Sequence, residues 1–296
     1  MWNIKTLRSI FAAMRLKHSI KNILVFIPII FAKQLFQTEL LLKQFSCFII
    51  FTLASSFVYI LNDMCDRKSD ACHPMKCKRP FASGELSPVT GIIVSALLLL
   101  SSIFLNIWIA GNILSTLFLL LYILINIAYN TGCKKQMLLD VAILSMGFVI
   151  RILYGGAFTS IPVSNWLLLT IMAGSLFMAF GKRRNELRDL NNSEETRAVL
   201  KKYGLTFLDR CINTSVTLSV VFYSLWCYSK EEAPNSGYIW SVPLLFFIFL
   251  RYCWYIEKED SDGDPVNVLL KDFCLQILSI IYIIYMGILL YQNQII

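Results

Sequence analysis

Long runs of apolar residues alternate with short polar segments along this chain. A helix that crosses a bilayer needs about 20 mostly apolar residues, and nine segments come close to that length. They are 20–36, 42–61, 89–109, 112–130, 138–158, 164–181, 211–229, 238–256 and 273–292. Strands of a membrane barrel would instead alternate polar and apolar residues over about ten positions. The pattern therefore predicts an all-α, polytopic membrane protein, in which the first span is the weakest because Pro28 interrupts it.

Composition agrees with this pattern. The chain has 296 residues, is 57% hydrophobic and 16% charged, and has a mean hydropathy of +0.63. We expect a single integral-membrane domain over residues 1–296. The basic segment 1–19 lacks the long apolar core of a cleavable signal, so the first span is expected to stay in the mature protein.

The distribution of cations predicts the orientation. Most of the 27 Lys and Arg residues fall in segments that share one side if the N-terminus is cytoplasmic. The long polar segments 62–88, 130–137, 182–210 and 257–272 then lie on the cytoplasmic face of the inner (plasma) membrane, where any chemistry is expected. The net charge of +8 is spread over these short loops, which argues against nucleic-acid binding.

An acidic motif follows the second apolar run. Asp63, Asp66 and Asp70 have the spacing i, i+3, i+7, which on one helix places them within about 60° of each other. Carboxylate oxygens suit Mg²⁺, which is commonly shared between protein carboxylates and substrate phosphates. Asn62 adds an amide, and Lys78 and Arg79 add donors for phosphate oxygens. The stretch predicts a receptor for a magnesium diphosphate.

Two other interpretations of this stretch stay open. It could be a solvated helix end with balanced charges. It could also hold zinc through Cys65, Cys72, His73 and Cys77, although their spacing matches no common zinc pattern. None of the nine cysteines forms a CxxC pair.

The stretch NDMCDRKSD, of the form NDxxDxxxD, is followed by HPMKCKRPFASGELS. It resembles the first aspartate-rich motif of the UbiA superfamily of intramembrane prenyltransferases. Four further stretches are similar to its decaprenyl-phosphate phosphoribosyltransferase branch, so that the resemblance covers most of the chain. These are RLKHSIKNILVFIPIIFA, LLDVAILSMGFVIRILYGGAF, IPVSNWLLLTIMAGSLFMAFGKRRNEL and RYCWYIEKEDSDGDPVNVLLKD.

Members of the superfamily that act on aromatic acceptors usually carry a second acidic cluster at the start of the fifth span. Here YNTGCKKQMLLD offers Tyr129, Lys134 and Lys135 but one carboxylate, Asp140, and GKRRNEL adds Lys182, Arg183 and Glu186. The resemblance thus implies one metal-diphosphate site, with Mg²⁺ on Asp63, Asp66 and Asp70 and with Asp140 as a further catalytic residue. The implied reaction moves 5-phosphoribose from phosphoribosyl diphosphate (PRPP) to a polyprenyl phosphate and releases diphosphate.

Other functions are weighed beside this one. A prenyltransferase would use a prenyl diphosphate and an aromatic or glycerol-type acceptor, and the missing second cluster argues against it. A transporter would carry ionisable residues near the middle of several spans, where Arg151 is the clear case.

Four residues nearer the N-terminus and in the fifth span complete the candidate site. Lys17, Lys21, Asn22 and Arg151 are expected to contact substrate phosphates. Lys21 and Asn22 could instead anchor the first span at the interface, and Arg151 could instead pair with Asp140. The expected partners are the membrane, the two substrates and a second copy of the chain in a homo-oligomer.

Overall fold

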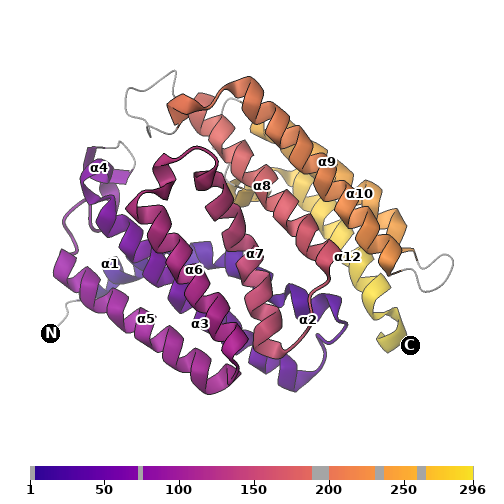
Figure 1. Ribbon diagram of the computed structural model, residues 1–296, viewed down its shortest axis with the longest axis horizontal. Helices are drawn as coiled ribbons and strands as arrows, with labels where there is room; N and C mark the ends of the chain where they lie inside the picture. Colours follow the sequence, from indigo (N-terminus) through magenta and orange to yellow (C-terminus); the bar gives the residue numbers. More distant parts are fainter. Residues whose placement is uncertain (1–3, 73–75, 189–199, 231–236, 259–264, 296) are drawn as a thin grey trace. The chain divides into compact units, whose positions relative to one another are not determined.

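The computed structural model describes residues 4–72, 76–188, 200–230, 237–258 and 265–295, and within these ranges all secondary structure is helical (Figure 1). Within these described ranges, eight helical segments are long and apolar enough to cross a membrane. They are α3 (Thr38–Cys65), α5 (Pro88–Ala110), α6 (Ile113–Thr131), α7 (Leu139–Thr159), α8 (Asn165–Arg188), α9 (Leu205–Ser229), η6 with α10 (Tyr238–Trp240 and Ser241–Ile256) and α12 (Phe273–Ile295). The prediction of a multi-pass helical membrane protein is confirmed.

Shorter elements connect these helices. They are α1 (Ile4–Met14), η1 (Leu16–Phe26), α2 (Ile27–Phe31), α4 (Arg67–Cys72), η2 (Lys76–Lys78), η3 (Cys133–Lys135), η5 (Leu200–Lys202) and α11 (Pro265–Lys271). Several of them carry the candidate site residues.

The first expected span, 20–36, differs from the prediction. The chain forms a 3₁₀ helix, η1, and then the five-residue helix α2, whose first turn contains Pro28. Proline has no N–H to give to an i−4 carbonyl and suits the first turn of a new helix. A 3₁₀ helix rises about 2.0 Å per residue, so the 11 residues of η1 extend over about 22 Å.

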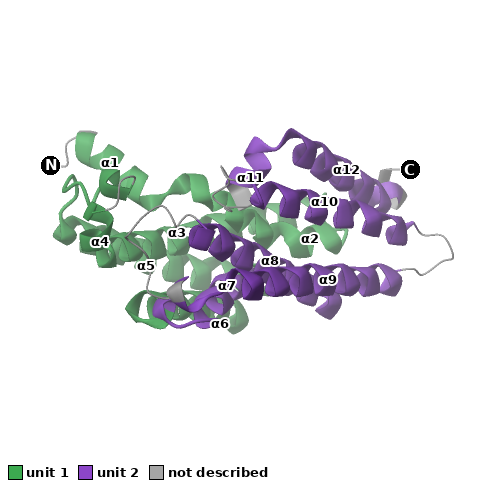
Figure 2. Cartoon of the chain, turned by 90° about the horizontal axis from the view of Figure 1, so that it is seen from above, with its two compact units in different colours: residues 1–133, 150–162 green, residues 134–149, 163–296 purple. Residues whose placement is uncertain are grey.

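The described chain divides into two compact units (Figure 2). Unit 1 contains residues 1–133 and 150–162, and unit 2 contains residues 134–149 and 163–296. Helix α7 contributes residues 139–149 to unit 2 and residues 150–159 to unit 1. The single domain expected from the sequence stays a prediction.

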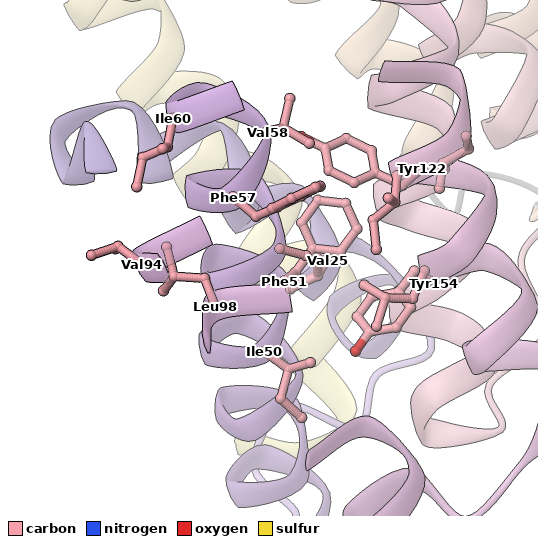
Figure 3. Close-up of a cluster of buried hydrophobic side chains, with 14 of the residues drawn as sticks. Val25, Ile50, Phe51, Phe57, Val58, Ile60, Val94, Leu98, Tyr122 and Tyr154 are labelled. Atoms are coloured by element: carbon pink, nitrogen blue, oxygen red, sulfur yellow. The ribbon is translucent and has the colours of Figure 1, made fainter. Parts of the chain in front are cut away.

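Unit 1 is built around α3, which packs against α5, η1, α1 and α6. Its core contains the buried side chains of Phe51, Tyr122 and Tyr154 (Figure 3). The Phe51 ring centroid lies 4.5 Å from that of Tyr122 and 5.2 Å from that of Tyr154, with the rings tilted in both pairs, and both separations are in the range usual for aromatic contacts. Arg151, a predicted site residue, lies against the Phe51 and Tyr122 rings of this core.

One close approach fixes the packing of η1 in unit 1. A Cβ atom placed on Gly155 of α7 would lie 2.2 Å from the carbonyl oxygen of Val25. The same oxygen accepts a hydrogen bond of 2.7 Å from the Gln44 amide of α3. Glycine at position 155 therefore lets the backbone of η1 contact α7 directly.

In unit 2, α8 packs along α9, and α10 packs against α12 and α9. Phe177 of α8 meets Tyr252 of α10 in the buried core, with ring centroids 5.1 Å apart. Arg188, the last residue of α8, donates to the carbonyl oxygens of Glu257 and Lys258 at 2.9 and 2.7 Å. A cation thereby satisfies carbonyls at the C-terminal end of α10.

Candidate functional site

The acidic motif lies at the polar end of α3. The helix ends at Cys65, and Asp66 occupies its C-cap with φ −89° and ψ 4°. These angles fall in the bridge region of backbone space, and α4 begins only at Arg67. The expectation that three aspartates share one continuous helical face is therefore wrong, because the helix is interrupted between the first aspartate and the third.

The structure brings two of the three aspartates together. Asp63 and Asp70 are both buried, with 2% and 5% of their surfaces exposed, whereas Asp66 is half-buried. Arg79 donates to Asp70 at 2.5 Å and to Asp63 at 3.4 Å, through the same Nη1 atom. A buried carboxylate is costly unless it is paired and hydrogen-bonded, and Arg79 pairs both.

Arg15 joins this cluster from the junction of α1 and η1. Its Nη2 atom lies 2.5 Å from Asp63 Oδ1, and its guanidinium lies 5.6 Å from the centroid of the Tyr59 ring. Its backbone is left-handed, with φ 51° and ψ 47°, which costs a residue other than glycine about 1–3 kcal/mol. The sequence analysis did not select Arg15, since nothing in the spacing relates it to Asp63.

These residues can be tested against a magnesium ion. Within the described ranges no group of three or more His, Cys, Asp and Glu side chains is arranged to hold a metal ion. The zinc alternative also depends on His73, which lies outside the described residues. Mg²⁺ needs few protein ligands when it binds with substrate phosphates, so the two carboxylates of Asp63 and Asp70 fit it by their chemistry.

Arg151 of α7 lies in the core of unit 1 and is 6% exposed. It donates to Asn22 Oδ1 at 2.9 Å and to the Tyr122 hydroxyl at 3.3 Å, and it stacks 5.1 Å from the Phe51 ring centroid. Asn22 donates in turn to the side-chain oxygens of Thr52 and Ser55. Arg151 and Asn22, both predicted site residues, therefore belong to one buried polar cluster.

Asp140 and Arg183 form a buried ion pair in unit 2. Arg183 Nε lies 2.6 Å from Asp140 Oδ2, and the two side chains are 1% and 0% exposed. Arg183 also contacts Glu186. This places three predicted site residues together, and it gives Asp140 a partner other than the Arg151 that the sequence alternative named.

Tyr203 is a further residue that the sequence analysis missed. Its hydroxyl donates to Asp140 Oδ1 at 2.8 Å and accepts from the backbone N–H of Leu138 at 2.8 Å. Leu138 has a left-handed backbone, with φ 70°. Burial raises the pKa of Tyr203 to about 12. The hydroxyl thus connects the turn that precedes α7 to one oxygen of the Asp140 carboxylate.

A second carboxylate-arginine pair stabilises the start of α12. Arg251 donates to both oxygens of Asp272, at 3.1 and 2.8 Å, and Asp272 Oδ1 accepts from the Leu275 N–H at 2.6 Å. The hydrogen bond from Arg251 lowers the pKa of Asp272. The sequence analysis did not include this pair, which lies in unit 2.

The other predicted site residues differ in exposure. Lys17, Lys78 and Lys135 are exposed, and Lys21, Asn62, Tyr129, Lys134 and Lys182 are half-buried. Most of them lie at or near helix ends, where long cationic side chains can reach solvent, whereas Lys21 lies in the middle of η1. Their contact with a substrate stays a prediction.

Comparison with known proteins identifies the family. The model of the UbiA prenyltransferase family matches residues 24–272. The chain belongs to the UbiA prenyltransferase family. The UbiA match begins within η1 and includes Asp63, Asp70, Arg79 and the cluster around Asp140, whereas Arg15 lies before it.

Relatives of this UbiA protein include several named decaprenyl-phosphate phosphoribosyltransferase. The protein of Mycolicibacterium smegmatis is 34% identical, with 82% of this chain and 79% of the relative covered. That of Corynebacterium glutamicum is 30% identical, with 92% and 83% covered.

A solved structure shares the UbiA fold. A UbiA homologue from Archaeoglobus fulgidus, bound to DMAPP and Mg²⁺, matches with a TM-score of 0.70 and 16% identity. The match covers 95% of this chain and 99% of the homologue. At this identity the likeness concerns the fold, and the chain is a multi-pass membrane protein of a transferase family.

Proposed function

We propose that the protein transfers 5-phosphoribose from PRPP to a polyprenyl phosphate of the decaprenyl type. The bond between the anomeric carbon and the diphosphate oxygen breaks, and the diphosphate leaves with the electron pair. A bond forms between the same carbon and an oxygen of the lipid phosphate. Phosphate monoesters are ionised near neutral pH, so this nucleophile requires no strong general base.

The likeness to the M. smegmatis relative, at 34% identity over 82% of the chain, carries this proposal. The geometry supports it in one respect. Asp140, the carboxylate at the position of a second acidic cluster, is bound by the fully buried Arg183 and by Tyr203, whereas the acidic pair Asp63 and Asp70 is bound by Arg15 and Arg79, whose side chains are partly exposed. One acidic pair is suited to one diphosphate.

Asp63 and Asp70 would hold the metal, with Asp66 next to them. When bound, Mg²⁺ neutralises negative charge on the departing diphosphate. Arg79 and Arg15 present guanidinium groups whose fork geometry fits phosphate oxygens, and both are partly exposed, at 26% and 20% of their side chains. Their part is to orient the diphosphate and to stabilise the charge that develops on it.

The remaining cations serve the other phosphates of the two substrates. Arg151 and Asn22 form the buried cluster within unit 1, and Lys17 and Lys21 lie on the same helix, η1. In unit 2, Lys134 and Lys135 form η3, and Lys182 precedes Arg183. Each cation would offset the negative charge of the substrate phosphate that it contacts.

A prenyltransferase activity is the second candidate. The A. fulgidus homologue that shares the fold is bound to DMAPP and Mg²⁺. If this chain used a prenyl diphosphate, DMAPP would compete with PRPP for the site. We expect PRPP to bind in preference to DMAPP.

The test uses purified full-length protein in detergent or in nanodiscs. With Mg²⁺, PRPP and decaprenyl phosphate, mass spectrometry should detect a phosphoribosylated lipid and released diphosphate. Parallel reactions contain shorter polyprenyl phosphates, and others contain DMAPP with an aromatic acceptor. A failure to form product with any lipid length, or prenylated product alone, refutes the proposal.

A further inference from the structure

The cluster at the end of α3 contains equal numbers of buried carboxylates and arginines. The Asp63 and Asp70 side chains are 2% and 6% exposed, and each lies 2.5 Å from an arginine nitrogen. Arg79 also lies 3.4 Å from Asp63. The two carboxylates therefore have their charge compensated before any ligand arrives.

This balance of charges disfavours the binding of a divalent cation that arrives without a diphosphate. A cation that binds Asp63 and Asp70 competes with the guanidinium groups for these carboxylates, since both arginines contact Asp63 Oδ1 and Arg79 also contacts Asp70 Oδ2. It also adds two positive charges beside two arginines. Like charges at such short separations repel strongly near a protein surface. A metal that arrives together with a diphosphate brings compensating negative charge, and the displaced arginines gain phosphate oxygens as partners.

We infer that Arg15 and Arg79 pair with the metal-binding carboxylates until a diphosphate binds, and that they then contact its phosphate oxygens instead. Metal and diphosphate therefore bind together, and the metal alone binds poorly. This inference rests on the proposed function only in placing a metal diphosphate at Asp63 and Asp70. It holds equally for a ribosyl and a prenyl diphosphate, since the exchange concerns the diphosphate oxygens.

The exposure of the four side chains agrees with this exchange. The arginine side chains are 20% and 26% exposed, whereas the carboxylates beneath them are almost fully buried. An incoming anion therefore reaches the guanidinium groups first. Arg15 also contacts the Tyr59 ring, and its left-handed backbone lies at the junction between two helices, where a local change of dihedral angles can redirect the side chain.

Two binding measurements test the inference, and neither needs turnover. Loss of the free Mn²⁺ signal in electron paramagnetic resonance measures binding of the metal alone. Retention of radiolabelled inorganic diphosphate by the protein, with and without Mn²⁺, measures joint binding. For the wild-type protein we expect little Mn²⁺ binding alone and retention of diphosphate that requires Mn²⁺.

Substitution of either arginine should move the two measurements in opposite directions. In Arg15→Gln or Arg79→Gln, Mn²⁺ alone should bind about tenfold more tightly, and Mn²⁺-dependent diphosphate retention should weaken about tenfold, the scale of one charge-assisted hydrogen bond. Arg8→Gln is the matched control, because Arg8 is an exposed arginine on the neighbouring helix α1. Arg8→Gln should leave both values unchanged.

The wild-type measurement needs no variant to fold. If wild-type protein binds Mn²⁺ equally tightly with and without diphosphate, the inference is overturned, while product formation from PRPP still supports the proposed function. If both Gln variants match wild type in both measurements, it is overturned as well. If Mn²⁺ and diphosphate do not bind even together, the metal site and the inference fail together.

Discussion

Arg15 and Arg79 come from distant parts of unit 1, and both contact Asp63. The aspartate motif could be selected from the sequence because carboxylates at short, regular spacing are unusual at the end of an apolar run. Arg15 could not, because its contact depends on how η1 returns to α3. The same holds for Tyr203, which reaches Asp140 from the far end of a long polar segment.

Asp63 and Asp70 should be indispensable for turnover. Each carboxylate accepts a hydrogen bond from a guanidinium that would orient the diphosphate in the proposed reaction. Asp63→Asn or Asp70→Asn should therefore lower kcat by about 10² to 10³ fold, the scale of losing one preorganised electrostatic contact. Initial rates with PRPP and decaprenyl phosphate give the values.

Asp209→Asn provides the control for these variants. Asp209 pairs with Arg184 at 2.6 Å in unit 2, but its side chain is 45% exposed, and exposed pairs contribute little. The control should retain near-normal activity. Near-normal activity in Asp63→Asn and Asp70→Asn would contradict the metal assignment.

At the scale of elements, the apolar runs predicted the membrane helices because length and hydropathy define a span independently of its neighbours. The polar extensions were harder to predict. The run 42–61 marks the apolar part of α3, but the helix continues from Thr38 to Cys65. Its interruption at Asp66 and the 3₁₀ geometry of η1 depend on local backbone angles that hydropathy does not report.

Gly155→Ala should destabilise unit 1. The new methyl group would lie 2.2 Å from the Val25 carbonyl oxygen, so η1 or α7 must shift, at a cost of about 1–3 kcal/mol for overpacking. Thermal unfolding in detergent should show a lowered Tm. Gly287→Ala in α12 is the control, because no atom lies within 4 Å of its added Cβ; equal Tm values for the two variants would contradict the close approach.

Asp272 should make the stability of unit 2 depend on acid pH. Its pKa is lowered in the folded state by Arg251, so the unfolded state binds its proton first as pH falls. The stabilisation is complete above the unfolded pKa of about 3.9 and is lost as pH falls through the lower folded value. Tm measured from pH 6 to pH 3 should fall less in Asp272→Asn than in wild type, and parallel curves would refute this.

At the scale of the whole molecule, the number of membrane crossings decides the topology. In the part of the chain that the structure describes, eight helices meet the length and hydropathy of a span. Elements η1 and α2 lie where the sequence predicted a ninth. If η1 and α2 cross the membrane, as the sequence predicts for this segment, residue 8 of α1 and residue 72 of α4 face the same side, the cytoplasm. If they do not cross, α3 alone separates these two positions and they face opposite sides.

Labelling with a membrane-impermeant maleimide distinguishes these topologies. In a variant that keeps Cys72 as its single cysteine, the exposed thiol should react from the cytoplasmic face. Arg8→Cys should react from the same face. Lys230→Cys, at the C-terminal end of α9, should react from the opposite face. If positions 8 and 72 were labelled from opposite faces, the chain would cross the membrane one time fewer than the sequence predicts.

The 3₁₀ geometry of η1 has a consequence for tolerance to substitution. In a helix of three residues per turn, side chains at i and i+3 lie directly above each other, and Asn22 and Val25 form such a buried pair. A saturation mutagenesis profile of residues 16–26 should therefore show sensitive positions every three residues. An inserted residue would rotate Asn22 by a third of a turn away from Arg151. Such an insertion should therefore lower activity more than any single replacement on the exposed side of η1.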